Sequence, residues 1–129
     1  RNCFQGKVFH FLEYDKRFEL ARAQESPDFL REMVYGRLYW PVGLTAKAKA
    51  QYEQYLQEHM AQIASAFIRQ KRGKELEWLL HTYPLTPDQR ELFAGLMDQA
   101  NASHASEILS MLMEYQRVHF PSRRRSFDL

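Results

Sequence analysis

Apolar side chains recur every third or fourth residue through most of this chain, the spacing that places them on one face of an α-helix. The pattern is clearest over 103–118, where it predicts one amphipathic helix, capped by Asn101 or Ser103 and stopped by Pro121. The apolar face of this helix consists of Ile108, Met111, Leu112, Tyr115 and His119, and Leu109 and Met113 widen it.

Capping residues and prolines mark where further helices begin and end. Thr86-Pro87-Asp88 and Ser26-Pro27-Asp28 each offer a capping hydroxyl, a proline suited to the first helical turn and an acid that complements the helix dipole. Thr45 caps a third start, and Pro41 and Pro84 end helices. We predict about six helices, from segments at 17–24, 27–40, 45–57, 57–72, 74–83, 87–100 and 103–118, and the two that meet near residue 57 are either bent or continuous.

The N-terminal region carries the weakest pattern. Lys7–Tyr14 is rich in aromatic and β-branched residues, as strands are, while Val8, Phe11 and Leu12 equally fit one helical face. The chain begins with Arg1 rather than Met, which we interpret as a fragment or processed piece of a longer chain, with a trimmed tag as the alternative.

Two segments of the chain match each other closely and lie 32 residues apart. Glu75–Tyr83 and Glu107–Tyr115 both read Glu, apolar, two variable residues, apolar, Leu, two variable residues, Tyr. The helices before them align after a slip of one residue, with Met60, Ile63, Ala64 and Phe67 matching Phe93, Leu96, Met97 and Ala100. A helical hairpin of about 32–33 residues is typical of helical repeat arrays, although two amphipathic helices share the 3,4 spacing automatically. We favour a true repeat because the Glu and Tyr positions match as well.

Several motifs resemble a known family. Arg37–Leu44 followed by Ala50–Leu56 looks like an R-L-x-Y-P-x-x-L segment leading into A-x-Y-x-x-Y-L, and Glu107–Tyr115 looks like a closing E-I-x-x-L-L-x-Y, all as in bacterial ankyrin-like helical repeat proteins. Trp40 stands where tyrosine is usual and Met111 where leucine is usual, and the standard T-P-L-H-x-A signature is absent. The resemblance covers roughly residues 30–120 and implies a scaffold for protein contacts, often one module of a longer polypeptide.

Together these patterns predict an all-α fold, a short solenoid of stacked antiparallel helix pairs. One helical-repeat domain would cover residues 1–120, with its best-defined units at 59–84 and 88–119, and a basic C-terminal tail would follow at 121–129. The last helix would close the array, because terminal units of such arrays need a polar outer face.

Composition narrows the function classes. The 129 residues are 45% hydrophobic, enough for one domain with a real core, and 18 basic against 16 acidic residues are too balanced to mark a nucleic-acid-binding protein. Cys3 stands alone, so no internal disulfide can form. No apolar run approaches the roughly 18–20 residues that a membrane span needs, and no signal peptide is evident. We therefore expect a soluble, cytoplasmic protein without a membrane partner.

The sequence holds no recognisable catalytic motif. Neither a P-loop, a dinucleotide-binding glycine motif nor a nucleophile elbow occurs. The five histidines form no His-Glu-x-x-His pair, and His104 and Glu107 are better explained as surface residues, since zinc needs three or four ligands. Cys3 lacks an identifiable basic activator. We predict a non-enzymatic chain with no metal and no cofactor.

The candidate binding residues are basic or aromatic. The run from Arg69 to Lys74 is basic and falls at a predicted helix end and turn, where positive charge also complements the helix dipole. For the aromatic candidates we favour packing against a neighbouring repeat, but any that stays exposed would be a hot spot for binding. The partner-binding set is Tyr52, Tyr55, Arg69, Lys71, Arg72, Lys74 and Trp78.

The leading hypothesis is a protein–protein interaction scaffold. Its predicted binding surface is the exposed side of the helices at 45–57 and 59–72. A second is association with nucleic acid through Arg123, Arg124 and Arg125 together with the 69–74 turn, because arginines bind phosphates without reading sequence. A third is a ligand-binding or enzymatic helical domain, which a deep inter-helix pocket holding two or more of the histidines and carboxylates would favour.

Overall fold

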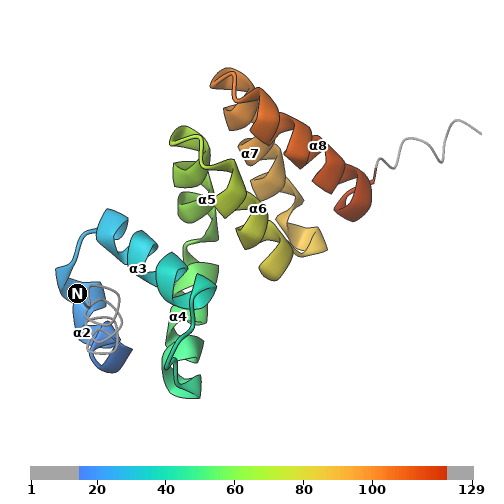
Figure 1. Cartoon of the computed structure of the whole chain (residues 1–129). Coiled ribbons are helices and arrows are strands. Elements are labelled where there is room, and N and C mark those ends of the chain that lie inside the picture. The colour runs from blue at the N-terminus through green and yellow to red at the C-terminus, as the bar shows by residue number, and fades with distance from the viewer. Residues whose placement is uncertain (1–14, 122–129) are drawn as a thin grey trace, which may run out of the picture. The chain divides into compact units, whose positions relative to one another are not determined.

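The structure, a computed structural model, describes residues 15–121 and divides the chain into two compact units, Arg1–Met60 and Ala61–Leu129. The first unit contains α2 (Phe18–Gln24), α3 (Pro27–Tyr39) and α4 (Ala46–Glu58). The second contains α5 (Met60–Arg69, which begins one residue before the boundary), α6 (Gly73–Thr82), the 3-10 helix η1 (Pro87–Gln89), α7 (Arg90–Ala102) and α8 (Ser106–His119), as Figure 1 shows.

Residues 15–121 form helices and no strand, which confirms the predicted all-α class. The seven labelled α-helices slightly exceed the six expected, partly because the chain bends at His59 and separates α4 from α5. At this bend the His59 amide donates to the carbonyls of both Tyr55 and Leu56, at 3.0 and 3.2 Å. Lys7–Tyr14, whose sequence fits either a strand or a helix, lies outside the described residues, as does the tail beyond residue 121.

The predicted capping residues begin the helices as expected. The hydroxyl of Ser26 accepts a hydrogen bond from the Phe29 amide, and that of Thr45 accepts one from the Ala48 amide, both at 3.1 Å. Each bond satisfies an amide that has no partner within its own helix. Thr86 forms a capping box with Gln89, although that box opens η1, and α7 follows from Arg90.

The predicted start of the last helix is wrong by three residues. α8 begins at Ser106, and neither Asn101 nor Ser103 caps it, because both belong to the end of α7. The chain reverses over residues 103–105, and the N-cap position of α8 is Ala105, whose side chain cannot accept a hydrogen bond. The 3,4 apolar spacing runs through both helices and does not reveal where one stops.

The first unit is held around a buried ionic cluster. Arg37 is fully buried and binds both carboxylate oxygens of Asp15, with its Nη2 2.9 Å from Oδ2. The Tyr52 hydroxyl donates a short hydrogen bond to the same carboxylate. The remaining Arg37 donors bind the carbonyls of Trp40 and Val42 at 2.9 and 2.8 Å, so this one side chain fixes the chain between α3 and α4.

Aromatic packing completes the first core. The Phe18 ring of α2 lies 4.6 Å from the Tyr52 ring and 5.8 Å from the Tyr55 ring, both of which α4 supplies. Arg22 covers the outer side of Tyr55 and pairs with Glu58 at 3.0 Å. Glu19, on the same helix, also pairs with Arg22, at 3.8 Å.

The second unit consists of two antiparallel helical hairpins, α5–α6 and α7–α8 (Figure 1). α8 packs on both α6 and α7, and the approach is close at Gly73, where an added Cβ would lie 3.3 Å from Ile108 Cγ1. The core is almost entirely apolar and includes Leu76, Leu79, Leu80, Phe93, Leu96, Ile108 and Leu112.

The Tyr115 hydroxyl joins the two hairpins, at the end of the second unit away from the α5–α6 and α7–α8 turns. The buried Tyr115 hydroxyl accepts a hydrogen bond from the Leu85 amide at 3.0 Å and donates to the Leu80 carbonyl at 3.3 Å. Burial raises the pKa of Tyr115 above its ordinary value, because a phenolate would lose hydration there. Its matched residue Tyr83 is only half-buried, so the two matched segments share a fully buried leucine, Leu80 and Leu112, and differ at this tyrosine.

Among residues 15–121, no helix is both long enough and apolar enough to serve as a membrane span.

Candidate interaction surface

The turn between α5 and α6 has an unusual conformation for its sequence. Lys71 has a φ of 59°, the left-handed region, where glycine is preferred because a Cβ is strained there. The Lys71 amide donates to the Ile68 carbonyl at 2.9 Å and the Arg72 amide to the Phe67 carbonyl at 2.8 Å. This pair of bonds satisfies the last carbonyls of α5 and defines a Schellman-type helix end.

The turn between α7 and α8 repeats this geometry 33 residues later. His104 has a φ of 56° and donates its amide to the Asn101 carbonyl at 3.1 Å. The Ala105 amide donates to the Ala100 carbonyl at 3.0 Å. Lys71 and His104 therefore occupy equivalent positions, and each places a polar side chain where glycine would be less strained.

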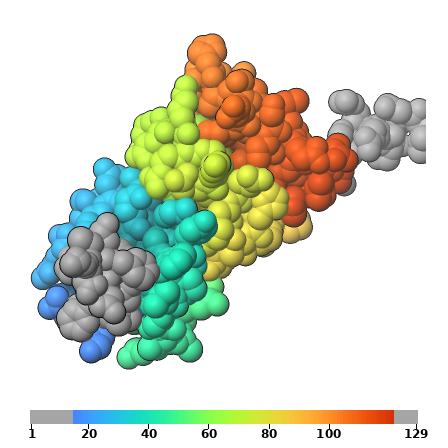
Figure 2. All heavy atoms as spheres, in the orientation of Figure 1, coloured from blue at the N-terminus to red at the C-terminus, as the bar shows by residue number. Residues whose placement is uncertain are grey.

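The two turns lie side by side. The Lys71 ammonium donates to the Ser103 carbonyl at 3.2 Å, and further along the same helices Gln99 Nε2 donates to the Ser65 carbonyl at 3.0 Å. In the space-filling view the ends of both hairpins emerge together at the upper edge of the molecule (Figure 2). We name this surface the basic turn edge and define it by Arg69, Lys71, Lys74 and His104.

The cations of the basic turn edge are exposed to solvent. Within residues 15–121, no carboxylate pairs with Arg69, Lys71 or Lys74. Arg72 differs, because it is half-buried, lies over the Phe67 ring and pairs with Glu75 at 3.4 Å. Arg72 is therefore committed to Glu75 and is not part of the basic turn edge.

The aromatic candidates are not brought to this edge. Tyr52 and Tyr55 are buried inside the first unit, so they do not meet the condition of exposure that we set for a binding hot spot. The surface that we predicted for binding, on the exposed side of the helix at 45–57, therefore includes neither tyrosine. Burial raises the pKa of both phenols, most strongly for Tyr52 beside the Asp15 carboxylate. Trp78 is half-buried, with its ring 5.9 Å from the Tyr83 ring.

Sequence reasoning missed an exposed apolar group at the end of α3. Tyr39, Trp40 and Val42 are 54%, 50% and 43% exposed, and the buried Arg37 holds the backbone of the last two. Tyr39 and Trp40 also make further contacts, Tyr39 stacking on Tyr35 at 5.5 Å among them. The available signal was Pro41, which ends the helix and turns the next residues outward.

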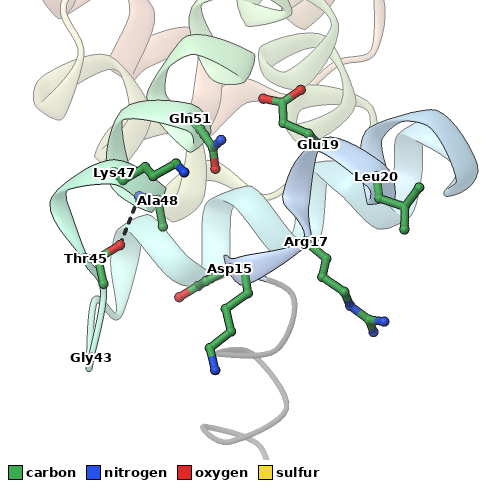
Figure 3. Close-up of a pocket in the computed structure, with 10 residues that line it drawn as sticks. Asp15, Arg17, Glu19, Leu20, Gly43, Thr45, Lys47, Ala48 and Gln51 are labelled. Atoms are coloured by element: carbon green, nitrogen blue, oxygen red, sulfur yellow. Dashed lines mark hydrogen bonds between the residues drawn. The ribbon is translucent and has the colours of Figure 1, made fainter.

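A cleft of about 680 Å³ opens between α2 and α4 in the first unit. Its walls carry three cations, Lys16, Arg17 and Lys47, and the acids Asp15 and Glu19, and Leu20, Thr45 and Ala48 are among its uncharged residues. In Figure 3 the labelled charged side chains, those of Asp15, Arg17, Glu19 and Lys47, point in different directions and do not converge on one point. The described lining residues include two carboxylates, Asp15 and Glu19, and no histidine, and the Asp15 carboxylate is already bound by Arg37 and Tyr52.

Residues 15–121 hold no group of three or more histidine, cysteine or acidic side chains arranged to bind a metal ion. His104 lies in a turn and Glu107 in α8, so the two are not neighbours on one helix as their spacing suggested. Cys3, His10, Arg123, Arg124 and Arg125 fall outside the described residues.

Comparison with known proteins gives no relative: no protein-family model, no curated protein and no solved structure matches this chain.

Proposed function

We propose that this chain is a non-enzymatic module that binds another protein through the basic turn edge. The carrying observation is the pair of equivalent turns that place Lys71 and His104 in left-handed conformations, side by side. A non-glycine residue in this conformation costs roughly 1–2 kcal/mol, and glycine at either position would avoid most of that cost. Strain of this kind concentrates where a side chain serves binding.

The helical hairpins supply the support that a binding edge needs. Each turn projects from two antiparallel helices packed on an apolar core, so the cations start from a rigid base. A rigid base lowers the entropy that is lost on binding. We further propose that the hairpins are copies of one helical repeat, as the ankyrin-like motifs suggest, with α8 at the end of the array. Glu107, Ser110, Glu114 and Arg117 of α8 are exposed, as a terminal unit requires, while Met113 and Val118 of the same helix are also exposed.

Site-specific photo-crosslinking tests the proposal. A photoreactive amino acid replaces Lys74 in one variant and Gln57, an exposed residue of α4, in the control. We expect a protein partner to crosslink from position 74 and not from position 57. Reversal of charge at Arg69 and Lys71 should remove that crosslink while the helical circular dichroism spectrum stays unchanged. Equal capture from both positions, or capture that survives the reversal, contradicts the proposal.

A further inference from the structure

We infer that the basic turn edge binds a carboxylate-rich segment of its partner, a run of Asp and Glu side chains. The inference rests on the proposed function, since it names the chemistry of the partner at the same edge. It follows from three features of the edge. These are its charges, the hydrogen-bond donors that its side chains leave unused, and the acidic residues that lie beside them.

The edge offers several unused hydrogen-bond donors. Lys71 gives one of its three ammonium donors to the Ser103 carbonyl, which anchors the side chain and leaves the others directed to solvent. Arg69 and Lys74 are exposed on either side of that turn. An Arg guanidinium binds a carboxylate through two parallel bonds, so the edge can hold more than one carboxylate at once.

His104 extends the edge onto the second hairpin. Its equivalence with Lys71 places an imidazole where the first turn has an ammonium, and the bond from Lys71 to Ser103 keeps the two turns adjacent. The ends of α5 and α7 both meet here, and basic side chains are favourable at helix C-termini. The edge therefore combines the cations of the first hairpin with an imidazole from the second.

Two features favour a carboxylate-rich protein segment over nucleic acid. Glu75, which pairs with Arg72, and Glu107 lie in the first turns of α6 and α8, so the cations are bordered by carboxylates. A phosphate backbone carries charge at every step and is repelled at such points, whereas a peptide can place a neutral residue there. Residues 69–75 and 101–107 also contain no Phe, Tyr or Trp on which a base could stack.

The test is fluorescence anisotropy with the full chain. One probe is a labelled peptide of about ten residues, rich in glutamate, and the other is a labelled single-stranded oligonucleotide of equal charge. The edge variant is Arg69→Glu with Lys74→Glu. The matched control is Lys47→Glu with Lys49→Glu, which makes the same change in net charge at two exposed residues of α4.

We expect the peptide to bind in low salt, at least about tenfold more weakly to the edge variant and less than about threefold more weakly to the control. Equal weakening in both variants means attraction to net charge alone and overturns the inference. Tighter binding of the oligonucleotide, lost in the edge variant, overturns it in favour of nucleic acid. If the peptide fails to bind while the position-74 crosslink to a protein persists, the inference is wrong and the proposed function stands.

Discussion

The two units of this chain are held together by different chemistry. The first is organised around a buried ion pair between residues 22 positions apart, Asp15 and Arg37, to which Tyr52 adds a hydroxyl. The second depends on an apolar core, in which the buried Tyr115 hydroxyl links Leu85 and Leu80. A buried ion pair costs desolvation and is very sensitive to loss of a partner, while an apolar core tolerates change in proportion to the volume removed.

The largest expected effect lies in the first unit. Arg37→Met leaves the Asp15 carboxylate buried without its cation and frees the Trp40 and Val42 carbonyls. We expect the free energy of unfolding of this unit to fall by about 3–5 kcal/mol. Trp40 fluorescence during urea denaturation reports it, with Trp78→Phe as the background. Adding Asp15→Leu should restore much of the loss, and a loss below about 1 kcal/mol for Arg37→Met alone contradicts the comparison.

A slightly smaller effect is expected from the apolar core of the second unit. Leu80 and Leu112 are fully buried and occupy matched positions of the two hairpins. Leu80→Ala and Leu112→Ala should each lower the free energy of unfolding by about 2–5 kcal/mol, with similar values for the two. Urea denaturation followed by Trp78 fluorescence measures both, in a Trp40→Phe background. Leu20→Ala, at an exposed residue, is the control and should change it by under about 0.5 kcal/mol. Very unequal losses for the two leucines would count against the repeat.

The two buried tyrosine hydroxyls should show the same contrast between the units, with smaller losses in the free energy of unfolding. Tyr52→Phe removes a donor to a charged group and should cost about 1.5–3 kcal/mol, while Tyr115→Phe removes bonds to neutral backbone and should cost about 0.5–1.5 kcal/mol. The pKa of both phenols is raised in the folded chain. Their stabilising effect is thus complete below the unfolded pKa of about 10 and declines as the pH rises above it.

This pH dependence provides a separate measurement. Denaturation series from pH 8 to about pH 11 should show that the stability of each unit declines in the wild type. In the second unit, Tyr115→Phe should remove the part of this decline that ionisation of the Tyr115 phenol causes. An unchanged alkaline decline in that unit after the substitution would mean that another group is responsible.

The smallest effect has the opposite sign. Lys71→Gly and His104→Gly relieve left-handed strain and should each stabilise the second unit by about 0.5 kcal/mol. Lys71→Gly should at the same time weaken binding of the carboxylate-rich peptide, because it removes a cation from the edge. Thermal denaturation paired with the anisotropy assay checks both directions. Destabilisation by glycine at either position would remove the strain argument for the proposed function.

Much of the fold was predictable because its signals are local. Ser26 and Thr45 cap the helices that their positions in the sequence indicate, since a cap bonds to an amide three residues away. The start of α8 was not predictable, because no glycine marks the turn at His104, and the apolar spacing continues across it. For the candidate site, the basic residues from 69 to 74 were found by charge alone, whereas the contribution of the second turn was not.

The burial of Tyr52 shows the limit of the same reasoning. α4 is rich in Ala, Lys and Gln, so its sequence does not reveal that Tyr52 faces the ionic cluster. Sequence by itself determined the helical class, most helix limits and the spacing of the two hairpins, since each depends on residues within one or two helical turns. Only the tertiary structure decided which charges are buried and that Lys71 meets Ser103, because those contacts join residues more than 20 positions apart.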